Sequence, residues 1–417
     1  MRLFELPADE VRRLVQSLRP DAEPESAAEV FARMAWTAII EPGDQIAGQL
    51  ICSLGPREAL EVLIAHDPTP AIDIWLEDGV EPRRAERIVV DAFARWRPRL
   101  AARPVLRTIE RAGALRLSIL LPEDPEWPAG LADLGPAAPV ALWARSAGSW
   151  SDAFDRAVAV VGARAATGYG EYVATEIASG LAERRITVIS GGAYGIDAAA
   201  HRAALVSGGT TIAFLAGGLD RYYPAGNAEL LARVADAGAV MSEVPPGVAP
   251  TKVRFLSRNR LLAAASAATV VVEAGIRSGS LNTAHHALAI GRPVGAVPGP
   301  VTSPTSAGCH RLVREADAVC ITCAGDAIEL AGGTREDVAA AYEGADPAVV
   351  RVLDELGLRG GRTVDEIARS SGMAVGEVLG VLAPLELADV VRQTEAGWVR
   401  VSNDRVRAGA HEVDGRR

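Results

Sequence analysis

The sequence predicts an α/β fold, in which an extended Rossmann-like parallel sheet domain is flanked by an N-terminal helical bundle and a C-terminal winged helix. Between residues 155 and 330, short apolar runs alternate with amphipathic stretches. This alternation is typical of a parallel sheet that helices cover on both faces. The segments before and after it instead repeat their apolar residues every three and four positions, which is the period of helices.

Residues 1–115 are expected to form a domain of short helices. Gly43 and Gly55 separate the helical stretches, and the arrangement has a faint likeness to a SAM or helix-hairpin-helix bundle. A proline-rich connector follows and leads to a strand-like segment, Val140–Trp143. The helical spacing is clearest in three stretches: Val11–Leu18, Ala28–Ile39 and Ala59–Ile64.

Residues 116–330 are expected to form the sheet domain. Its amphipathic stretches include Tyr172–Glu183 and Asn227–Ala237. Because parallel sheets of this kind bind ligands at the carboxyl ends of their strands, the site is expected at that edge. The six apolar runs are Ala157–Val161, Thr187–Ile189, Thr211–Leu215, Ala239–Met241, Thr269–Val272 and Val294–Val297.

Residues 345–402 are expected to form the winged helix, and residues 403–417 a polar, disordered tail. The third expected helix contains Glu377 and no basic residue. A recognition helix enters the major groove of duplex DNA, so this composition favours contact with protein over base readout. The expected helices and strands are Ala348–Leu356, Thr363–Arg369, Val375–Leu382, Val390–Gln393 and Trp398–Val401.

The charge of the chain is unevenly distributed. Its 43 basic and 53 acidic residues give a net charge of −10 and a pI of about 5.3, which at first sight argues against a nucleic-acid partner. The segment 244–314, however, holds eight basic residues and one acidic residue, a net charge of +7 that leaves −17 on the rest of the chain. This segment also contains Phe255, and cations beside an aromatic ring suit single-stranded nucleic acid.

Several classes of protein are excluded by composition. Lys252 is the only lysine, and it follows Pro250 and Thr251, so the chain has no P-loop for nucleotide hydrolysis. Four cysteines indicate a reducing compartment, and Cys320 and Cys323 are interpreted as ordinary thiols. No signal-like segment and no apolar run near ~20 residues is present. We expect a cytoplasmic protein without metal or cofactor.

Two glycine-rich turns follow the first two strands of the sheet. They begin at Gly162-Ala163-Arg164 and at Ser190-Gly191-Gly192. Such turns let backbone N–H groups approach a phosphate. A dinucleotide site is not favoured, because GARAAT differs from GxGxxG and the second strand ends in a serine where an acid would hold the ribose.

A series of ordered motifs between about residues 115 and 325 resembles the DNA-processing protein A family (DprA/Smf). The motifs are GAR, SGGAYGIDAAAH, AGGLDRYYP, SEVPPG, FLSRNR, EAGIRSGSLNTA and GRPVGAVPGP. The resemblance implies a single-stranded DNA-binding protein that forms a homodimer through its Rossmann-like domain. It also implies that the protein protects incoming strands and loads RecA recombinase onto them during natural transformation. It implies no catalysis and no membrane partner.

The resemblance also assigns candidate DNA-binding residues. Those expected to line the groove are Arg164, Lys252, Phe255, Arg258 and Arg260, and those in loops beside it are Ser190, Gly191, Gly192, Ser278, Gly279 and Ser280. Arg164 and Lys252 are expected to contact phosphates, and Phe255 to stack against a base.

Four further polar residues are better explained structurally. Asn259, although it belongs to the candidate set, is expected to hold the loops in place together with Glu273. Asp197 and His201 resemble an acid–base pair, but a helix cap followed by a packed imidazole explains their spacing better.

Two other functions remain open. The first is a nucleotide-processing enzyme of the lysine-decarboxylase-like phosphoribohydrolase group, which has the same type of sheet. Those enzymes carry a PGGxGTxxE loop, which is absent before Glu273 here. The second is a nucleotide-sensing or scaffold module without DNA affinity. Release of ribose phosphate would indicate the enzyme, and stabilisation by a nucleotide without DNA binding would indicate the sensor.

Overall fold

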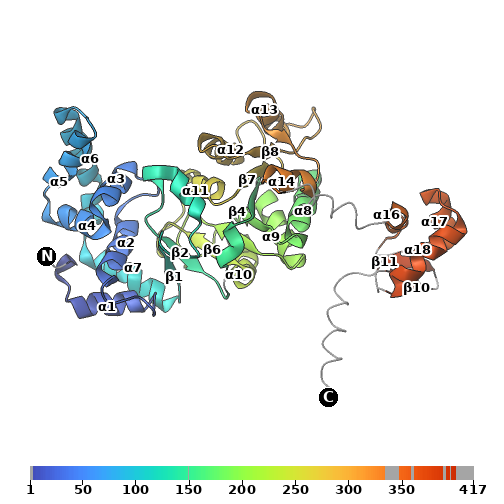
Figure 1. Ribbon diagram of the computed structural model, residues 1–417, viewed down its shortest axis with the longest axis horizontal. Coiled ribbons are helices and arrows are strands. Elements are labelled where there is room, and N and C mark those ends of the chain that lie inside the picture. Colours follow the sequence, from blue (N-terminus) through green and yellow to red (C-terminus); the bar gives the residue numbers. More distant parts are fainter. Residues whose placement is uncertain are drawn as a thin grey trace, which may run out of the picture. The chain divides into compact units, whose positions relative to one another are not determined.

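The first part of the chain forms the expected helices. In the computed structural model, which describes residues 3–148, 150–333, 347–357, 361–387, 391–394 and 396–400, seven α-helices precede the sheet (Figure 1). The expected tail 403–417 lies outside the described residues. The helices are α1 (Ala8–Gln16), α2 (Ala27–Ile39), α3 (Gln45–Leu54), α4 (Pro56–Ala65), α5 (Thr69–Glu77), α6 (Pro82–Trp96) and α7 (Ala102–Ala114).

The start of α3 illustrates how side chains define these helices. The Asp44 carboxylate accepts hydrogen bonds from the backbone N–H groups of Ile46 and Ala47, at 3.1 and 3.2 Å. It thereby caps the first turn of α3. The same carboxylate accepts a hydrogen bond from the indole Nε1 of Trp96, at 2.9 Å. One acidic side chain therefore joins the beginning of α3 to the end of α6.

A mixed sheet of nine strands follows, in the order β1-β2-β6-β5-β4-β3-β7-β8-β9. Strands β3 to β9 pair in parallel, whereas β2 pairs antiparallel with both β1 and β6. The strands are β1 (Ser118–Leu120), β2 (Leu142–Arg145), β3 (Ala157–Val161), β4 (Thr187–Ser190), β5 (Thr211–Phe214), β6 (Ala239–Ser242), β7 (Ala268–Val271), β8 (Val294–Ala296) and β9 (Val319–Cys320).

The six predicted apolar runs are confirmed as β3 to β8, each within one residue of its predicted ends. The strand-like segment Val140–Trp143 is found two residues further along, as β2. Strands β1 and β9 at the two edges of the sheet were not predicted. They have three and two residues, which is too short for an apolar pattern to be recognised.

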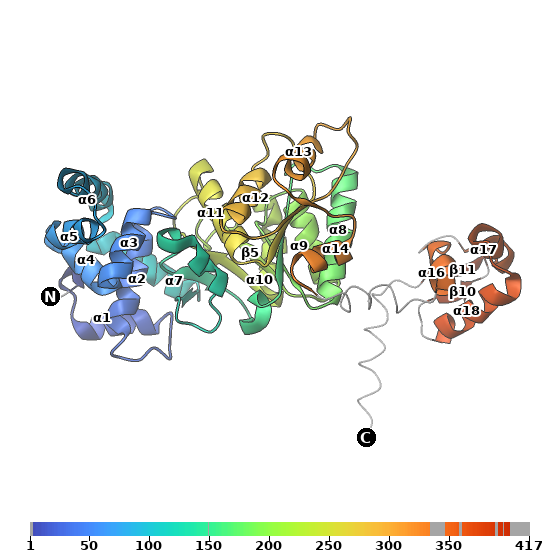
Figure 2. The same ribbon diagram turned by 45° about the horizontal axis from the view of Figure 1, so that its top comes forward.

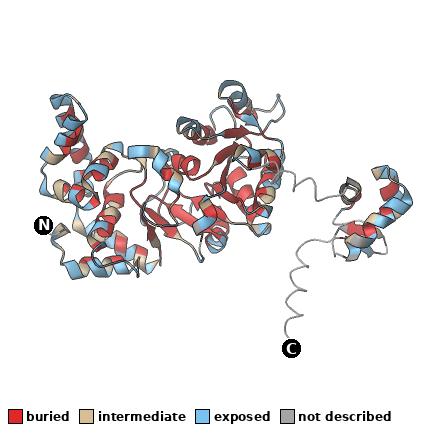
Figure 3. Cartoon of the chain, viewed as in Figure 1, coloured by how far each residue is buried: buried red, intermediate tan, exposed pale blue. Residues whose placement is uncertain are grey.

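Helices cover both faces of the sheet (Figure 2), and its strands are buried (Figure 3). The alternation of apolar residues along β5 agrees with this arrangement. Ile212 and Phe214 belong to one apolar cluster, while Ala213 between them belongs to another. Successive strand residues point to opposite faces, so both faces are buried. The helices are α8 (Gly168–Glu183), α9 (Ile196–Val206), α10 (Ala228–Ala237), α11 (Lys252–Ala264), α12 (Ser280–Ala289), α13 (Ala307–Glu315) and α14 (Ala324–Leu330).

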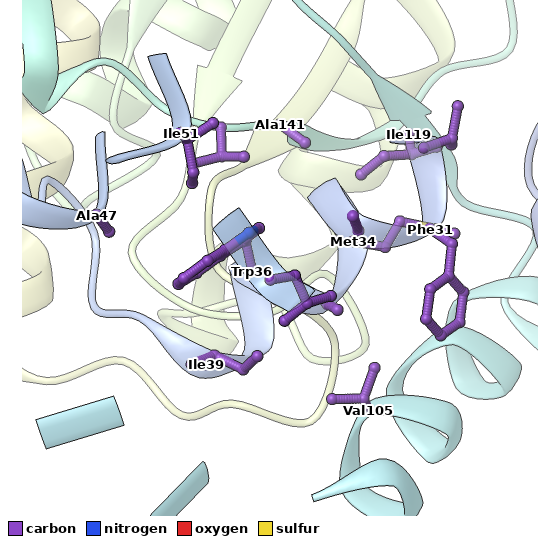
Figure 4. Packing of buried hydrophobic residues seen from close by; sticks show 14 of the residues in the cluster. Phe31, Met34, Trp36, Ile39, Ala47, Ile51, Val105, Ile119 and Ala141 are labelled. Atoms are coloured by element: carbon purple, nitrogen blue, oxygen red, sulfur yellow. The ribbon is translucent and has the colours of Figure 1, made fainter. Parts of the chain in front are cut away.

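The helical segment and the sheet share one hydrophobic core (Figure 4). Phe31 and Trp36 of α2, Val105 of α7 and Ile119 of β1 belong to the same buried cluster. The indole Nε1 of Trp143 in β2 donates to the hydroxyl of Thr37, at 3.2 Å. Residues 1–334 accordingly form one compact unit and residues 335–417 another. The change from helices to sheet near residue 115 is a change of architecture within a continuous core.

The second unit has the expected order of a winged helix. Its helices pack around a cluster that includes Val352, Ile367, Val378 and Trp398. The last helix extends to Leu387, five residues past its predicted end. The elements are α16 (Pro347–Asp354), α17 (Val364–Ser371), α18 (Val375–Leu387), β10 (Val391–Thr394) and β11 (Gly397–Arg400). Within the described parts of both units, no helix has the length and apolar character needed to cross a membrane.

Helix α11 is fastened into the first unit by Arg260. Its guanidinium forms two hydrogen bonds with the Glu243 carboxylate, at 2.7 and 2.8 Å, and a third with the carbonyl oxygen of Ala137, at 3.0 Å. Arg260 and Glu243 are 5% and 8% exposed. The sequence interpretation put Arg260 in a DNA groove. The structure places it in the interior, because the adjacent carboxylate neutralises it there.

We expect Glu243→Ala to lower the free energy of unfolding by about 3–5 kcal/mol, since it leaves the Arg260 charge buried without its partner. Urea denaturation followed by tryptophan fluorescence measures this change. The control is Glu61→Ala, which removes the more exposed Arg57–Glu61 pair on α4 and should cost no more than about 1 kcal/mol. Equal effects of the two substitutions would contradict the structural role of the buried pair.

Candidate nucleic-acid interface

The order of the strands creates a crevice between β3 and β7. After β3 the chain adds β4, β5 and β6 on one side, and it then returns to add β7, β8 and β9 on the other. The loops that follow β3 and β7 therefore diverge from neighbouring strands at the carboxyl edge of the sheet. Open α/β sheets bind ligands at such a reversal of strand order.

A groove of about 880 Å³ lies at this edge. Its walls come from the loop after β3, from the segment that includes Tyr223, from the first half of α11 and from the loop 275–280. The structure brings together eight of the predicted site residues in the lining: Arg164, Lys252, Phe255, Arg258, Asn259, Ser278, Gly279 and Ser280.

The centre of the groove is an aromatic side chain in contact with a cation. The guanidinium carbon of Arg164 lies 4.7 Å from the ring centroid of Phe255, a distance at which a cation is attracted by the ring. The ring of Tyr223 lies 5.6 Å from that of Phe255, with an angle of 55° between the planes. Phe255 is half-buried, while Tyr223 is 48% exposed. The two rings thus form an accessible apolar surface beside a positive charge.

Three cations at the groove are exposed: Arg164, Lys252 and Arg277. None of them forms an ion pair with another residue in the part of the chain that the structure describes. Their charges are therefore available to an anionic ligand. The acidic residue in the lining, Asp197, is buried.

Glu273 holds the loop that presents Arg164. Its carboxylate is 2% exposed and accepts hydrogen bonds from the backbone N–H and the hydroxyl of Thr167, at 2.8 and 2.9 Å. It also accepts a hydrogen bond from the Thr305 hydroxyl, at 2.6 Å. The Thr167 hydroxyl in turn caps α8 through the N–H of Gly170. Glu273 is thus a structural residue, as predicted, and it joins loops from three parts of the sheet.

Arg258 forms the floor of the groove and is 6% exposed. Its guanidinium donates to the carbonyl oxygens of Gly191, at 2.8 Å, and of Phe214. Burial lowers the pKa of Arg258 to about 10, so it is still charged at neutral pH. A Cβ atom on residue 191 would lie 2.2 Å from the Arg258 guanidinium, which explains the glycine there. Arg258 lies in the groove lining as predicted, and its guanidinium also ties α11 to the ends of β4 and β5.

The glycine-rich turn after β4 lies behind the groove. Ser190, Gly191 and Gly192 are buried, and the Ser190 hydroxyl donates to the carbonyl oxygen of Val160, at 2.6 Å. These three predicted residues are not part of the lining, which the turn reaches through Ala193. Their contribution is to shape the backbone beneath Arg258.

Asn259 orients the loop on the opposite wall. Its side-chain amide donates to the carbonyl oxygen of Gly279 and to the side-chain oxygen of Asn282, both at 3.2 Å. Within the same loop the hydroxyls of Ser278 and Ser280 are 2.8 Å apart. The structural role preferred for Asn259 on the sequence agrees with these contacts.

Asp197 and His201 do not form an acid–base pair. Asp197 accepts hydrogen bonds from the N–H groups of Gly191 and Ala193, at 3.1 and 3.3 Å. The Nδ1 atom of His201 lies 2.7 Å from the hydroxyl of Thr211, which donates to a backbone carbonyl. Burial raises the pKa of Asp197 and lowers the pKa of His201 to about 3. Both residues therefore support the turn after β4 and the packing behind it.

Sequence reasoning did not assign Tyr223 and Arg277 to the site. Tyr223 belongs to the AGGLDRYYP motif, but the motif does not reveal which of its two tyrosines reaches Phe255. Arg277 was counted in the basic segment 244–314, yet only the folded loop shows that it lies at the groove and not elsewhere on the surface.

The fold and the arrangement of motifs define a Rossmann-like α/β protein with a winged-helix unit. The family model described as DNA recombination-mediator protein A matches residues 118–332, and that of the DprA winged helix domain matches residues 336–397. The chain belongs to the DprA/Smf family of DNA recombination-mediator proteins.

Relatives span most of the chain. A putative DNA processing protein DprA of Mycobacterium tuberculosis is 49% identical over 311 residues, which cover 71% of this chain and 78% of that protein. The protein Smf of Escherichia coli is 36% identical over 261 residues, covering 58% and 67%. The crystal structure of DNA processing protein A from Streptococcus pneumoniae matches with a TM-score of 0.54 and 28% identity, covering 72% of this chain and 96% of that one.

The buried His201 predicts a pH dependence of stability. Its folded-state pKa of about 3 lies below the ordinary value of about 6.5, so the unfolded chain binds the proton more readily. The contribution of the neutral His201 side chain to the free energy of unfolding is complete above pH 6.5, and it declines as the pH falls toward 3. Between pH 7 and pH 5, His201 should account for a loss of about 2 kcal/mol in the free energy of unfolding.

The variant His201→Asn should lose less stability over this interval, although it starts from a lower value at pH 7. The exposed-site variant His285→Asn is the control and should keep the pH dependence of the unsubstituted protein. Urea denaturation at several pH values measures both. An unchanged pH dependence in His201→Asn would contradict the assignment of a neutral, buried imidazole.

Proposed function

We propose that this protein binds single-stranded DNA in the groove and acts through it as a recombination mediator. The observation that carries the proposal is the half-buried ring of Phe255, which lines the groove between Arg164 and the exposed ring of Tyr223, with exposed cations around it. Aromatic side chains stack on bases of any sequence, and cations bind the phosphates between them. The groove offers both kinds of contact within one site.

The same chemistry favours a single strand over a duplex. In a duplex the faces of the bases are stacked on one another, so they are not available to Phe255 or Tyr223. In the winged helix, the exposed side chains of Val375 and Leu379 on α18 are apolar. They supply no charge for the phosphates of a duplex, so we propose that this unit contacts protein.

Membership of the family supports the wider role. We propose that the protein protects incoming single strands and loads RecA recombinase onto them during natural transformation. We further propose that it acts in the cytoplasm as a homodimer through its Rossmann-like domain. The DNA then remains bound in the groove while the recombinase is delivered by protein contacts elsewhere on the surface.

The groove favours a binding role over the phosphoribohydrolase alternative. A hydrolase needs a carboxylate that is free to act on a substrate. Glu273 is engaged by the hydroxyls of Thr167 and Thr305, and Asp197 by backbone N–H groups. We therefore propose a function without a catalytic step.

The protein is expected to bind oligo-dT more tightly than a duplex of equal length, with an affinity that falls as salt rises. Each phosphate contact contributes about −0.7 to the slope of log K against log salt, so Lys252→Ala should reduce the slope by about 0.7. Fluorescence anisotropy titrations at several salt concentrations measure it. Arg202→Ala on α9, outside the groove, is the control and should leave the slope unchanged. Equal affinity for duplex and single strand would contradict the proposal.

Substitution of the aromatic side chain should have a different signature. Phe255→Ala is expected to weaken oligo-dT binding by about 1–3 kcal/mol through the loss of stacking, with little change in the salt dependence. Phe255→Trp should retain most of the affinity, because it keeps an aromatic face at the same position. If Phe255→Ala weakened the binding of oligo-dT only by reducing the salt slope, the ring would not be in contact with a base.

A further inference from the structure

Four arginines recur at intervals of four residues along η2 (Arg97–Arg99) and α7. We call Arg99, Arg103, Arg107 and Arg111 the α7 arginine stripe, and all four are exposed. Arg103, Arg107 and Arg111 are four residues apart within α7 and are therefore neighbours on one face of it, whereas Arg99 precedes the helix in η2. The stripe lies outside the basic segment 244–314 and takes no part in the groove described above.

One end of the stripe is joined to the segment that leads to Tyr223 in the groove lining. The guanidinium of Arg111 donates to the Asp220 carboxylate, at 2.8 Å. The other oxygen of that carboxylate accepts the N–H of Gly247, at 2.6 Å. Asp220 precedes Tyr223 by three residues, in the segment that follows β5. Because Arg103 and Arg107 share a helix face with Arg111, this face leads to the segment that continues from Asp220 to Tyr223 in the groove lining.

The other end is joined to the cationic wall. Arg99 donates to the Glu41 carboxylate, at 2.6 Å. The same carboxylate accepts two hydrogen bonds from Arg254, at 2.8 and 2.9 Å. Arg254 lies in the first turn of α11, two residues after Lys252. Both ends of the stripe are therefore held by carboxylates to segments that build the groove.

The two middle arginines remain unneutralised. Neither Arg103 nor Arg107 forms an ion pair with any residue in the described ranges, and Glu110 on the same helix does not bond to them. Like charges four residues apart destabilise an isolated helix. An anion along this face would remove that repulsion, and the rise of α7 separates Arg103 from Arg111 by about 12 Å, enough for more than one phosphate.

We propose that the α7 arginine stripe is a second contact site for the backbone of single-stranded DNA, which extends the path of the strand from the groove past Tyr223 onto the helical segment. The inference rests on the proposed single-strand binding in the groove. The stripe offers cations without an exposed aromatic ring on α7, so it holds phosphates and does not read bases. Its effect is to lengthen the stretch of DNA that one protein molecule covers.

The test compares two lengths of oligo-dT, about 6 and about 20 nucleotides, the shorter matched to a single groove. Arg103→Ala/Arg107→Ala should bind the short oligonucleotide like the unsubstituted protein. It should bind the long one about tenfold to thirtyfold more weakly near 0.1 M salt, with a salt slope smaller by about 1.4. Arg103→Lys/Arg107→Lys should restore both values, because it keeps the charges.

The matched control is Arg83→Ala/Arg87→Ala on α6. This pair has the same spacing, is exposed and forms no ion pair with a described residue, so it should leave both affinities unchanged. Thermal unfolding verifies that each variant is folded.

Unchanged affinity of Arg103→Ala/Arg107→Ala for the long oligonucleotide would overturn the inference and leave the groove intact as a site. An equal loss in the control pair would also overturn it, since the effect would then come from net charge. Failure of the unsubstituted protein to bind either oligonucleotide would overturn the proposed function itself.

Discussion

The groove depends on one buried carboxylate at the carboxyl end of β7. Glu273 accepts hydrogen bonds from Thr167, in the loop after β3, and from Thr305, in the loop after β8. The strand order reverses between β3 and β7, so the loops that follow these strands belong to different halves of the sheet. The hydrogen bonds of Glu273 hold these loops together. Arg164 owes its place above Phe255 to this arrangement, because its loop runs directly into the Thr167 cap of α8. The acid is thus the support of a cationic site and not a participant in its chemistry.

The basic residues of α11 have different roles according to whether they are buried or exposed. Arg258 and Arg260 are enclosed and directed at carbonyl oxygens and at Glu243, so they join α11 to the rest of the first unit. The planar guanidinium suits this role, since several fixed donors meet acceptors on different segments. Lys252 is exposed at the start of the same helix. A flexible, hydrated ammonium is better suited to follow a mobile phosphate than to fill a buried position.

The sequence predicts the sheet more completely than the site. Apolar runs, glycine turns and ordered motifs were sufficient for β3 to β8 and for the position of Phe255. Helical geometry places Arg258 and Arg260 on opposite flanks of the face formed by Lys252, Phe255 and Asn259, each about 100° from its centre. It does not predict their burial, because Asn259 on that face is buried as well. The position of a residue on the helix also does not indicate which residues pack against Arg258 and Arg260. The acceptors at the carboxyl ends of β4, β5 and β6 come from distant parts of the chain, so only the fold reveals them. The same limit applied to Tyr223 and Arg277.

The net charge of −10 is compatible with a DNA-binding protein because charge acts locally. At about 0.1 M salt, interactions between exposed charges are largely screened beyond roughly 10 Å. If a strand binds in the groove as we propose, it would therefore interact mainly with Arg164, Lys252 and Arg277, and distant acids would contribute little to its binding. Farther from the groove the same acids disfavour adsorption of DNA on the remaining surface. On this proposal, a cationic groove on an otherwise acidic chain would restrict the strand to the groove.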